Sequence, residues 1–226
     1  MLHVLDNNQI DTIETKYKTY NLKTTLSNSN EKFVQDKQDI IKLIDNNLSE
    51  PYSSYVYIYF LNNFPELCYY LKEEDTIVGC IIGKYDTHKS SRLRGYIGML
   101  VVCKEKRGEQ LGKYLILKEL QHFRDQIKCD EVILETQCNN TVALNLYKKF
   151  GFICLKRYKH FYNENQDGKD AFMLILGFSD KSGQRGVFLQ QTMMKSLIIW
   201  NKKEIFCFVL QPMIDIYLSF NVSYYI

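Results

Sequence analysis

A glycine-containing loop between an apolar segment and an amphipathic one is the first feature of the sequence with chemical meaning. The loop reads Arg107-Gly108-Glu109-Gln110-Leu111-Gly112; it follows the apolar run Met99–Val102 and leads into Lys113. In a strand-loop-helix arrangement, backbone N–H groups converge at the helix N-terminus, where the helix dipole favours a diphosphate. The loop therefore indicates a pyrophosphate-bearing ligand, although an ordinary strand-to-helix turn fits the hexapeptide by itself at least as well.

Two later segments carry polar side chains suited to proton transfer. Glu135 lies at the end of the β-rich run Glu131–Thr136, and Asn140 and Tyr147 lie at the start and within the next segment. A carboxylate can accept a proton from an amine, and a phenol can donate one to a leaving group. The plain alternatives are that Glu135 orients a loop or pairs with a lysine, and that Tyr147, at helical spacing from Leu144, is a core residue.

Hydrophobic patterning predicts the elements that position these residues. Strands are expected at Leu67–Lys72, Ile77–Tyr85, Arg94–Val102, Glu131–Thr136, Ile153–His160 and Phe172–Leu176. Helices are expected around Tyr55–Phe60, at Lys113–Lys128 with Leu115, Leu117, Leu120 and Phe123 as its candidate buried residues, and at Thr141–Phe150. Strands followed by alternating strand and helix predict an α/β fold with a mixed, mostly antiparallel sheet flanked by helices.

Composition narrows the class of protein. The net charge of +3 is far below that of a dedicated nucleic-acid binder, so no direct nucleic-acid partner is expected. The seven cysteines are scattered and contain no C-x-x-C pair, which favours neither disulfides nor a metal site. The N-terminus lacks the pattern of an export signal. A reducing, cytoplasmic location fits best.

The two ends of the chain differ from its middle. Residues 1–47 are rich in Asn, Lys, Asp, Thr and Ser and are expected to be a largely disordered arm. Residues 48–178 are expected to hold the folded domain, and residues 179–226 form a tail of uncertain structure. Its apolar part, Ile205–Phe220, is shorter than a membrane span needs and contains Asp215, so no membrane association is expected.

These motifs together resemble those of the GNAT acetyltransferases. The acetyl-CoA loop of that family is written [RQ]-x-x-G-x-[GA], and its next helix ends in L-Y-x-x-x-G-F, which matches Leu146 to Phe152 here. The resemblance narrows to the family of catalytic subunits of the N-terminal acetyltransferase C (NatC) complex through E-P-Y-S, F-P-E-L, R-G-Y-I-x-M-L-x-V, L-E-T, N-x-x-A-L-x-L-Y and D-A-x-x-L, which span about Leu48 to Leu176.

The resemblance implies an activity and partners. Its members transfer acetyl from acetyl-CoA, without a metal, to the α-amine of nascent chains that begin with Met and a bulky apolar residue. They work in the cytosol with auxiliary, ribosome-associated subunits. A GNAT enzyme acting on lysine side chains or small amines, and an inactive GNAT-fold scaffold subunit, remain alternatives.

The resemblance also assigns residues. Glu135 is the expected base, acting through a water, because a protein α-amine with a pKa near 7.7–8.0 must lose a proton before it attacks a thioester. Tyr147 is expected to stabilise or protonate the departing thiolate. The acetyl-CoA-binding set is expected to be Leu100, Val101, Val102, Arg107, Gly108, Gln110, Leu111, Gly112, Lys113, Asn140 and Tyr147. The peptide is expected to contact Glu50, Pro51, Tyr52, Tyr55 and Tyr162.

Three positions depart from the family pattern: Gln110 in the cofactor loop, Gln137 where the family has a second acidic residue, and Phe161 where it has the first tyrosine of a pair. Gln110 stands where the family has the middle glycine of the cofactor loop. A side chain there can crowd the phosphate or shift the loop, so weaker acetyl-CoA binding is predicted.

Overall fold

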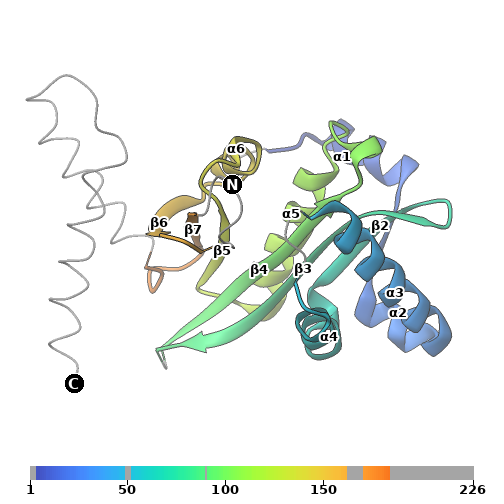
Figure 1. Cartoon of the computed structure of the whole chain (residues 1–226), viewed down its shortest axis with the longest axis horizontal. Helices are drawn as coiled ribbons and strands as arrows, with labels where there is room; N and C mark the ends of the chain where they lie inside the picture. The colour runs from blue at the N-terminus through green and yellow to red at the C-terminus, as the bar shows by residue number, and fades with distance from the viewer. Residues whose placement is uncertain (1–3, 49–51, 90, 162–169, 184–226) are drawn as a thin grey trace, which may run out of the picture. The chain divides into compact units, whose positions relative to one another are not determined.

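The computed structural model describes residues 4–48, 52–89, 91–161 and 170–183. The chain forms two compact units, Met1–Leu134 and Glu135–Ile226, whose boundary falls within strand β5, Glu131–Gln137 (Figure 1). The first unit contains the cofactor loop, and the second contains the predicted base and the predicted thiolate partner.

The first unit is built on an antiparallel meander. Its strands are β1 Lys18–Asn21, β2 Cys68–Glu73, β3 Thr76–His88 and β4 Arg92–Val102. Each strand pairs with the next, and β4 continues to β5 in parallel from Arg94 to Tyr96. The three strands predicted for this region are confirmed with slightly different ends, whereas β1 was not expected.

The N-terminal region is folded, so the expectation of a largely disordered arm over residues 1–47 is wrong for the described part. Its helices are α1 Asn7–Lys16, α2 Leu22–Asn28 and α3 Asn30–Asn47. The polar residues that suggested disorder are helix caps: the side chains of Asp6, Asn21 and Ser29 each accept a backbone N–H of the helix that follows. Several apolar residues of these helices, among them Leu22, Ile40 and Ile44, are fully buried. The folded region therefore begins well before residue 48.

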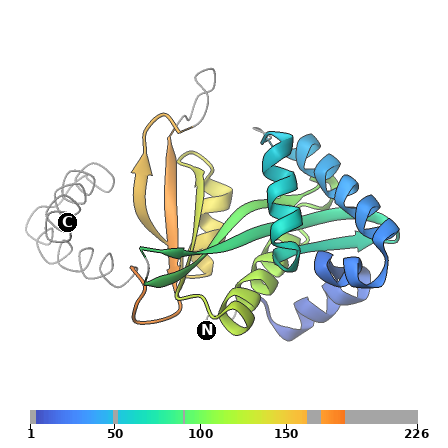
Figure 2. The ribbon, with the colours of Figure 1, turned by 90° about the horizontal axis from the view of Figure 1, so that it is seen from below.

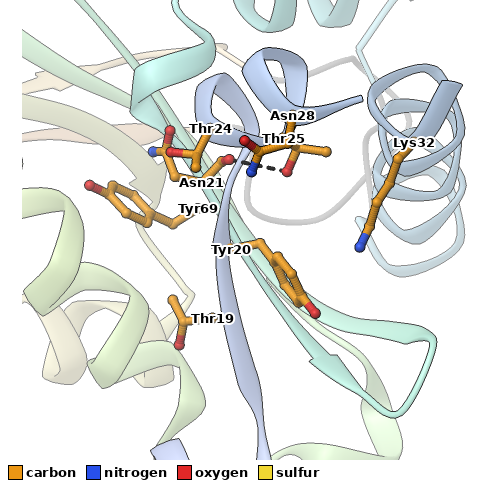
Figure 3. Close-up of a pocket in the computed structure, with 8 residues that line it drawn as sticks. All are labelled: Thr19, Tyr20, Asn21, Thr24, Thr25, Asn28, Lys32 and Tyr69. Carbon is orange, nitrogen blue, oxygen red and sulfur yellow. Dashed lines mark hydrogen bonds between the residues drawn. The ribbon is translucent and has the colours of Figure 1, made fainter. Parts of the chain in front are cut away.

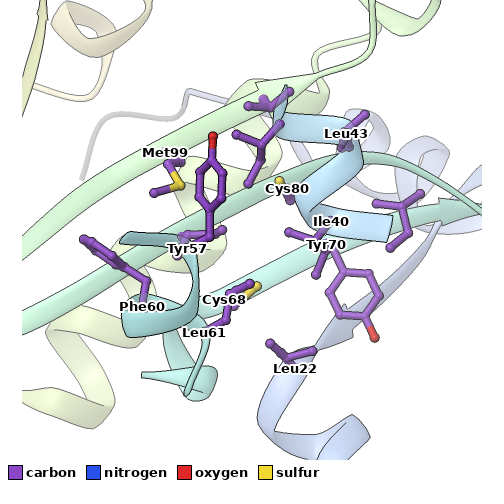
Figure 4. Packing of buried hydrophobic residues seen from close by; sticks show 14 residues of the cluster. Leu22, Ile40, Leu43, Tyr57, Phe60, Leu61, Cys68, Tyr70, Cys80 and Met99 are labelled. Atoms are coloured by element: carbon purple, nitrogen blue, oxygen red, sulfur yellow. The ribbon is translucent and has the colours of Figure 1, made fainter. Parts of the chain in front are cut away.

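Helices cover both faces of this sheet. In Figure 1 and Figure 2, α3 and α4 (Ser54–Asn63) lie on one face of β2–β4, and α5 (Leu111–His122) lies with α1 on the other. The core under α3 and α4 is shown in Figure 4 and comprises Leu22, Ile40, Leu43, Ile44, Tyr57, Phe60, Leu61, Cys68, Tyr70, Ile77, Cys80, Ile82, Met99 and Val101. Because side chains alternate along a strand, Tyr70 faces this core, whereas Tyr69 bonds His122 of α5.

The helix predicted at Lys113–Lys128 exists, but its last turn is wider than an α-helix. Helix α5 ends at His122 and continues as a π-turn over Phe123–Ile127. Three of its predicted core residues are buried, whereas Leu117 is only partly buried. The Phe123 ring packs so closely on β4 that a Cβ at Gly95 would lie 2.7 Å from it. Glycine at that position lets the helix approach the sheet.

The second unit contains the end of β5 and three further elements. These are α6 Thr141–Lys149, β6 Ile153–Tyr158 and β7 Ala171–Gly177, with β7 between β5 and β6 in the strand order and antiparallel to β6. Gly151, with a φ of 88°, follows α6 in the left-handed conformation typical of a helix end. The predicted helix and strands are confirmed, and the α/β fold class with a mixed, mostly antiparallel sheet flanked by helices is correct.

The predicted C-terminal tail lies largely outside the described residues, which end at Gly183. The segment Ile205–Phe220, considered as a membrane anchor, is part of it. Among the helices that the structure describes, none combines the length and the apolar character of a membrane span.

Candidate active site

The cofactor loop has an unusual backbone. After β4 the chain makes a short 3-10 turn, Lys104–Lys106, and then reaches Gly108 with a φ of 93° and Gln110 with a φ of 65°. Glycine adopts such angles freely, but a residue with a Cβ in the left-handed region costs on the order of 1 kcal/mol. The Gln110 side chain is exposed and does not cap α5. The departure from the family pattern is therefore accommodated by local backbone strain.

The start of α5 fits a diphosphate. The N–H groups of Leu111 and Gly112 belong to the first turn of the helix and so have no carbonyl partner within it. No acidic side chain stands in that turn, and the space beside Gly108 is open, since a Cβ there would meet nothing within 4 Å. These donors, together with the helix dipole, suit the pyrophosphate of acetyl-CoA.

The end of β4 can supply further backbone donors. Leu100, Val101 and Val102 pair with β3 on one side, whereas the pairing of β4 with β5 stops at Tyr96. Successive residues of an antiparallel strand direct their N–H and C=O groups to opposite sides. The segment Leu100–Val102 therefore has backbone groups directed away from β3 that can contact the thioester and its pantetheine arm.

Glu109 of the loop is held by the N-terminal region. Its Oε2 accepts hydrogen bonds from the Lys16 ammonium at 2.7 Å and from the Tyr17 hydroxyl at 2.6 Å. These two donors, Lys16 first, hold the pKa of the Glu109 carboxyl below its usual range, and Glu109 raises the pKa of Lys16 in return. Sequence reasoning missed both donors, because the polar composition of residues 1–47 predicted no ordered contact there.

The second unit places the remaining predicted chemical residues along β5 and α6. Glu135 is half-buried near the end of β5. Asn140 is the N-cap of α6, and its side-chain oxygen accepts the Ala143 N–H at 3.0 Å. Asn140 thus bonds an adjacent backbone group, and its contact with acetyl-CoA stays a prediction. Tyr147 is buried, with its ring edge-to-face against Phe152 at 5.6 Å between centroids.

The predicted peptide-binding residues are only partly described. Tyr52 and Tyr55 are exposed near the start of α4, with 42% and 85% of their surfaces accessible. The Tyr52 N–H donates to the buried Tyr57 hydroxyl at 2.9 Å, which fixes this end of the helix. Glu50, Pro51 and Tyr162 lie outside the described residues.

A separate pocket of about 320 Å³ lies beside β1 and α2 (Figure 3). It is lined by Thr19, Tyr20, Asn21, Thr24, Thr25, Asn28, Lys32 and Tyr69. None of the residues predicted to bind acetyl-CoA or peptide lines this pocket. Among the described residues, no group of three or more His, Cys, Asp or Glu side chains is arranged to hold a metal ion.

Comparison with known proteins defines the class. The profile of the Acetyltransferase (GNAT) family matches residues 37–152, and the chain belongs to this family. N-alpha-acetyltransferase 30 of Saccharomyces cerevisiae is 46% identical over 156 residues, covering 66% of this chain and 86% of the relative. The Schizosaccharomyces pombe protein of the same name is 40% identical over 139 residues, covering 62% of this chain and 90% of the relative.

Solved structures agree. A crystal structure of the NatC complex bound to Gag peptide and CoA matches with a TM-score of 0.61 and 42% identity, covering 72% of this chain and 98% of that one. Arabidopsis thaliana Naa50, in complex with a bisubstrate analogue, has a TM-score of 0.59 and 24% identity over 72% of this chain and 99% of that one, which shows the shared fold alone. The chain is thus an acetyl-CoA-dependent acetyltransferase of the N-alpha class, and its resemblance to the NatC catalytic subunit is confirmed.

Proposed function

We propose that this enzyme acetylates the α-amine of polypeptides that begin with Met followed by a bulky apolar residue, in the cytoplasm and together with auxiliary subunits of the NatC type that bring it to the ribosome. The observation that carries the proposal is the 42% identity to a chain of a NatC complex that was crystallised with a peptide and CoA. The exposed Tyr52 and Tyr55 offer aromatic surface and hydroxyl groups to such a peptide.

The reaction needs a base that takes a proton from the amine and an acid that protonates the leaving thiolate. In this proposal Glu135 takes a proton from the α-ammonium through a water, and the amine nitrogen then attacks the thioester carbonyl. Backbone N–H groups of Leu100–Val102 stabilise the oxyanion. The C–S bond breaks as the intermediate collapses, and Tyr147 protonates the coenzyme A thiolate. The attacking nitrogen loses its second proton to solvent, and Tyr147 regains a proton from solvent. The new amide carries the acetyl group, and the proton held by Glu135 is released to solvent.

The test compares two peptides with labelled acetyl-CoA. One begins Met-Leu with a free N-terminus; the other is N-terminally blocked and contains an internal lysine. Acetylation of the first alone is expected, with slower transfer when Leu is replaced by Glu. Transfer only to the blocked peptide would replace the proposal with a lysine acetyltransferase. Transfer to neither, in the presence of auxiliary subunits, would favour an inactive scaffold.

Glu135→Gln tests the base directly. Loss of a general base lowers kcat by about 10²- to 10⁴-fold, and the loss should become smaller at high pH, where more of the amine is already neutral. Glu74→Gln is the matched control, because Glu74 is exposed in the turn between β2 and β3. An unchanged kcat in Glu135→Gln would remove Glu135 from the mechanism without affecting the assigned substrate.

A further inference from the structure

The acetyl-CoA loop and the N-terminal region are joined through one side chain. Glu109 Oε2 receives the Tyr17 hydroxyl at 2.6 Å and the Lys16 ammonium at 2.7 Å. Tyr17 is 2% exposed and its bond to the carboxylate is part-buried, whereas the Lys16 side chain is 47% exposed and its ion pair is more strongly screened. The Tyr17 hydroxyl is therefore the less screened of the two contacts.

The donors are themselves held in place. Helix α1 is tied to α5 because Glu14 accepts hydrogen bonds from Tyr114 at 2.7 Å and from Lys118 at 3.0 Å. Lys16 also lies 3.9 Å from Glu73 of β2, and Glu73 pairs with Lys106 at 2.6 Å. The contact to Glu109 thus comes from a segment with a fixed position on the first unit.

The loop needs such support because of the residue next to Glu109. Gln110 is held at a φ of 65°, and a non-glycine residue stays in that region only where the surrounding structure determines it. Gly108, on the other side of Glu109, is free to change conformation. A carboxylate fixed between these two residues limits the backbone conformations of both.

The source of the support lies outside the part of the chain that matches the family profile. That match covers residues 37–152, so Lys16 and Tyr17 precede it while Glu109 falls within it. We propose that Tyr17 and Lys16 are positioning residues for acetyl-CoA: through Glu109 they hold the loop Arg107–Gly112 so that the first N–H groups of α5 meet the diphosphate. This proposal rests on the assignment of the loop to acetyl-CoA.

The proposal predicts an effect on affinity rather than on turnover. In the full-length chain, Tyr17→Phe and Glu109→Gln should each raise the Kd for acetyl-CoA, measured by calorimetry, by about three- to tenfold, because a hydrogen bond to a charged group is lost. The KM for acetyl-CoA should rise in parallel, and kcat should stay within about twofold. Lys16→Met should have a smaller effect, and Lys16→Arg should restore the affinity.

Controls and a double variant separate this role from a general loss of stability. Tyr59→Phe and Lys18→Met change exposed residues that are not in contact with the loop, and they should leave the Kd unchanged. Tyr17→Phe combined with Glu109→Gln should weaken binding little more than Glu109→Gln alone, because the Glu109 change already disturbs the bond that Tyr17→Phe removes. The thermal midpoint of each variant, measured without ligand, shows whether the substitution also lowers the stability of the fold.

Three outcomes would overturn the proposal, and the last of them would also remove the proposed function. If the wild-type chain binds acetyl-CoA and both Tyr17→Phe and Glu109→Gln bind it with the same Kd, the positioning role is excluded and the proposed function stands. Additive effects of the two changes would also exclude it, since they would then act separately. Wild-type chain that does not bind acetyl-CoA would remove the loop assignment and the proposed function with it.

Discussion

Two buried carboxylates, one on each face of the first unit's sheet, are accommodated in opposite ways. Asp36 of α3 is 1% exposed and accepts the Lys72 ammonium at 2.6 Å and the Tyr70 hydroxyl at 2.5 Å. Glu119 of α5 is fully buried, and neither of its oxygens has a hydrogen-bond partner among the described residues. Burial, and after it the charge of Glu66, raises the pKa of Glu119 well above its ordinary value.

The comparison shows two ways in which a buried carboxyl group is stabilised beneath a helix. Under α3 the desolvated charge is balanced by a cation, and the Tyr70 hydroxyl that donates to it also bonds Thr25 at 2.8 Å. Burial raises the pKa of Tyr70, so this hydroxyl keeps its proton. Under α5 the carboxyl is accommodated by becoming neutral. The first arrangement depends on its partners, and the second depends on pH.

The largest expected effect comes from breaking the paired site. Asp36→Ala leaves the Lys72 charge buried without its partner, which should lower the free energy of unfolding by about 3–5 kcal/mol. Urea denaturation measures it. Asp39→Ala on the same helix is the control, since the Asp39 pair with Lys42 lies at the surface and its loss should cost less than about 1 kcal/mol. Equal losses in the two variants would mean that burial of the Asp36–Lys72 pair does not raise the cost of breaking it.

Glu119 should make the free energy of unfolding depend on pH. Glu119 is protonated when folded and ionises near 4.5 when unfolded, so above that pH the folded state holds one more proton than the unfolded state. Its contribution to stability is therefore complete below pH 4.5 and falls by up to about 1.4 kcal/mol per pH unit until the pH reaches the raised pKa. Glu119→Gln should remove this decline and make the protein more stable than wild type at pH 8.

Urea denaturation between pH 5 and 8 tests the prediction for Glu119. Glu31→Gln, at an exposed position in the first turn of α3, is the control and should keep the wild-type slope. A Glu119→Gln protein with that same slope would mean that another group titrates.

The smallest expected effect is on the affinity for acetyl-CoA and concerns Gln110, which precedes α5. Gln110→Gly removes the left-handed strain and should tighten acetyl-CoA binding by a few-fold, on the order of 1 kcal/mol at most. Lys128→Gly is the matched control, because Lys128 has a φ of 61° just after the π-turn, away from the loop. Calorimetry should show a tighter Kd only for Gln110→Gly. Affinity unchanged in that variant would mean that Gln110 does not limit binding.

Much of the fold could be predicted because the signals were local. Runs of β-forming and apolar residues marked β2, β3 and β4, and the α5 pattern placed Leu115 and Leu120 in the core. The cofactor loop was recognisable from Gly108 and Gly112 between a strand and a helix. Asn140 preceded α6 as a cap, which is again a short-range property.

The sequence by itself therefore determined the class of enzyme, the loop that suits acetyl-CoA and most of the secondary structure, since each depends on residues that are neighbours along the chain. Only the tertiary structure decided that residues 7–47 are folded, that Tyr17 reaches Glu109, and that Asp36 is paired while Glu119 is not. Those contacts join residues from 34 to 92 positions apart. Composition and periodicity carry no information about such pairs, because the partner of a polar group is set by how the helices pack on the sheet.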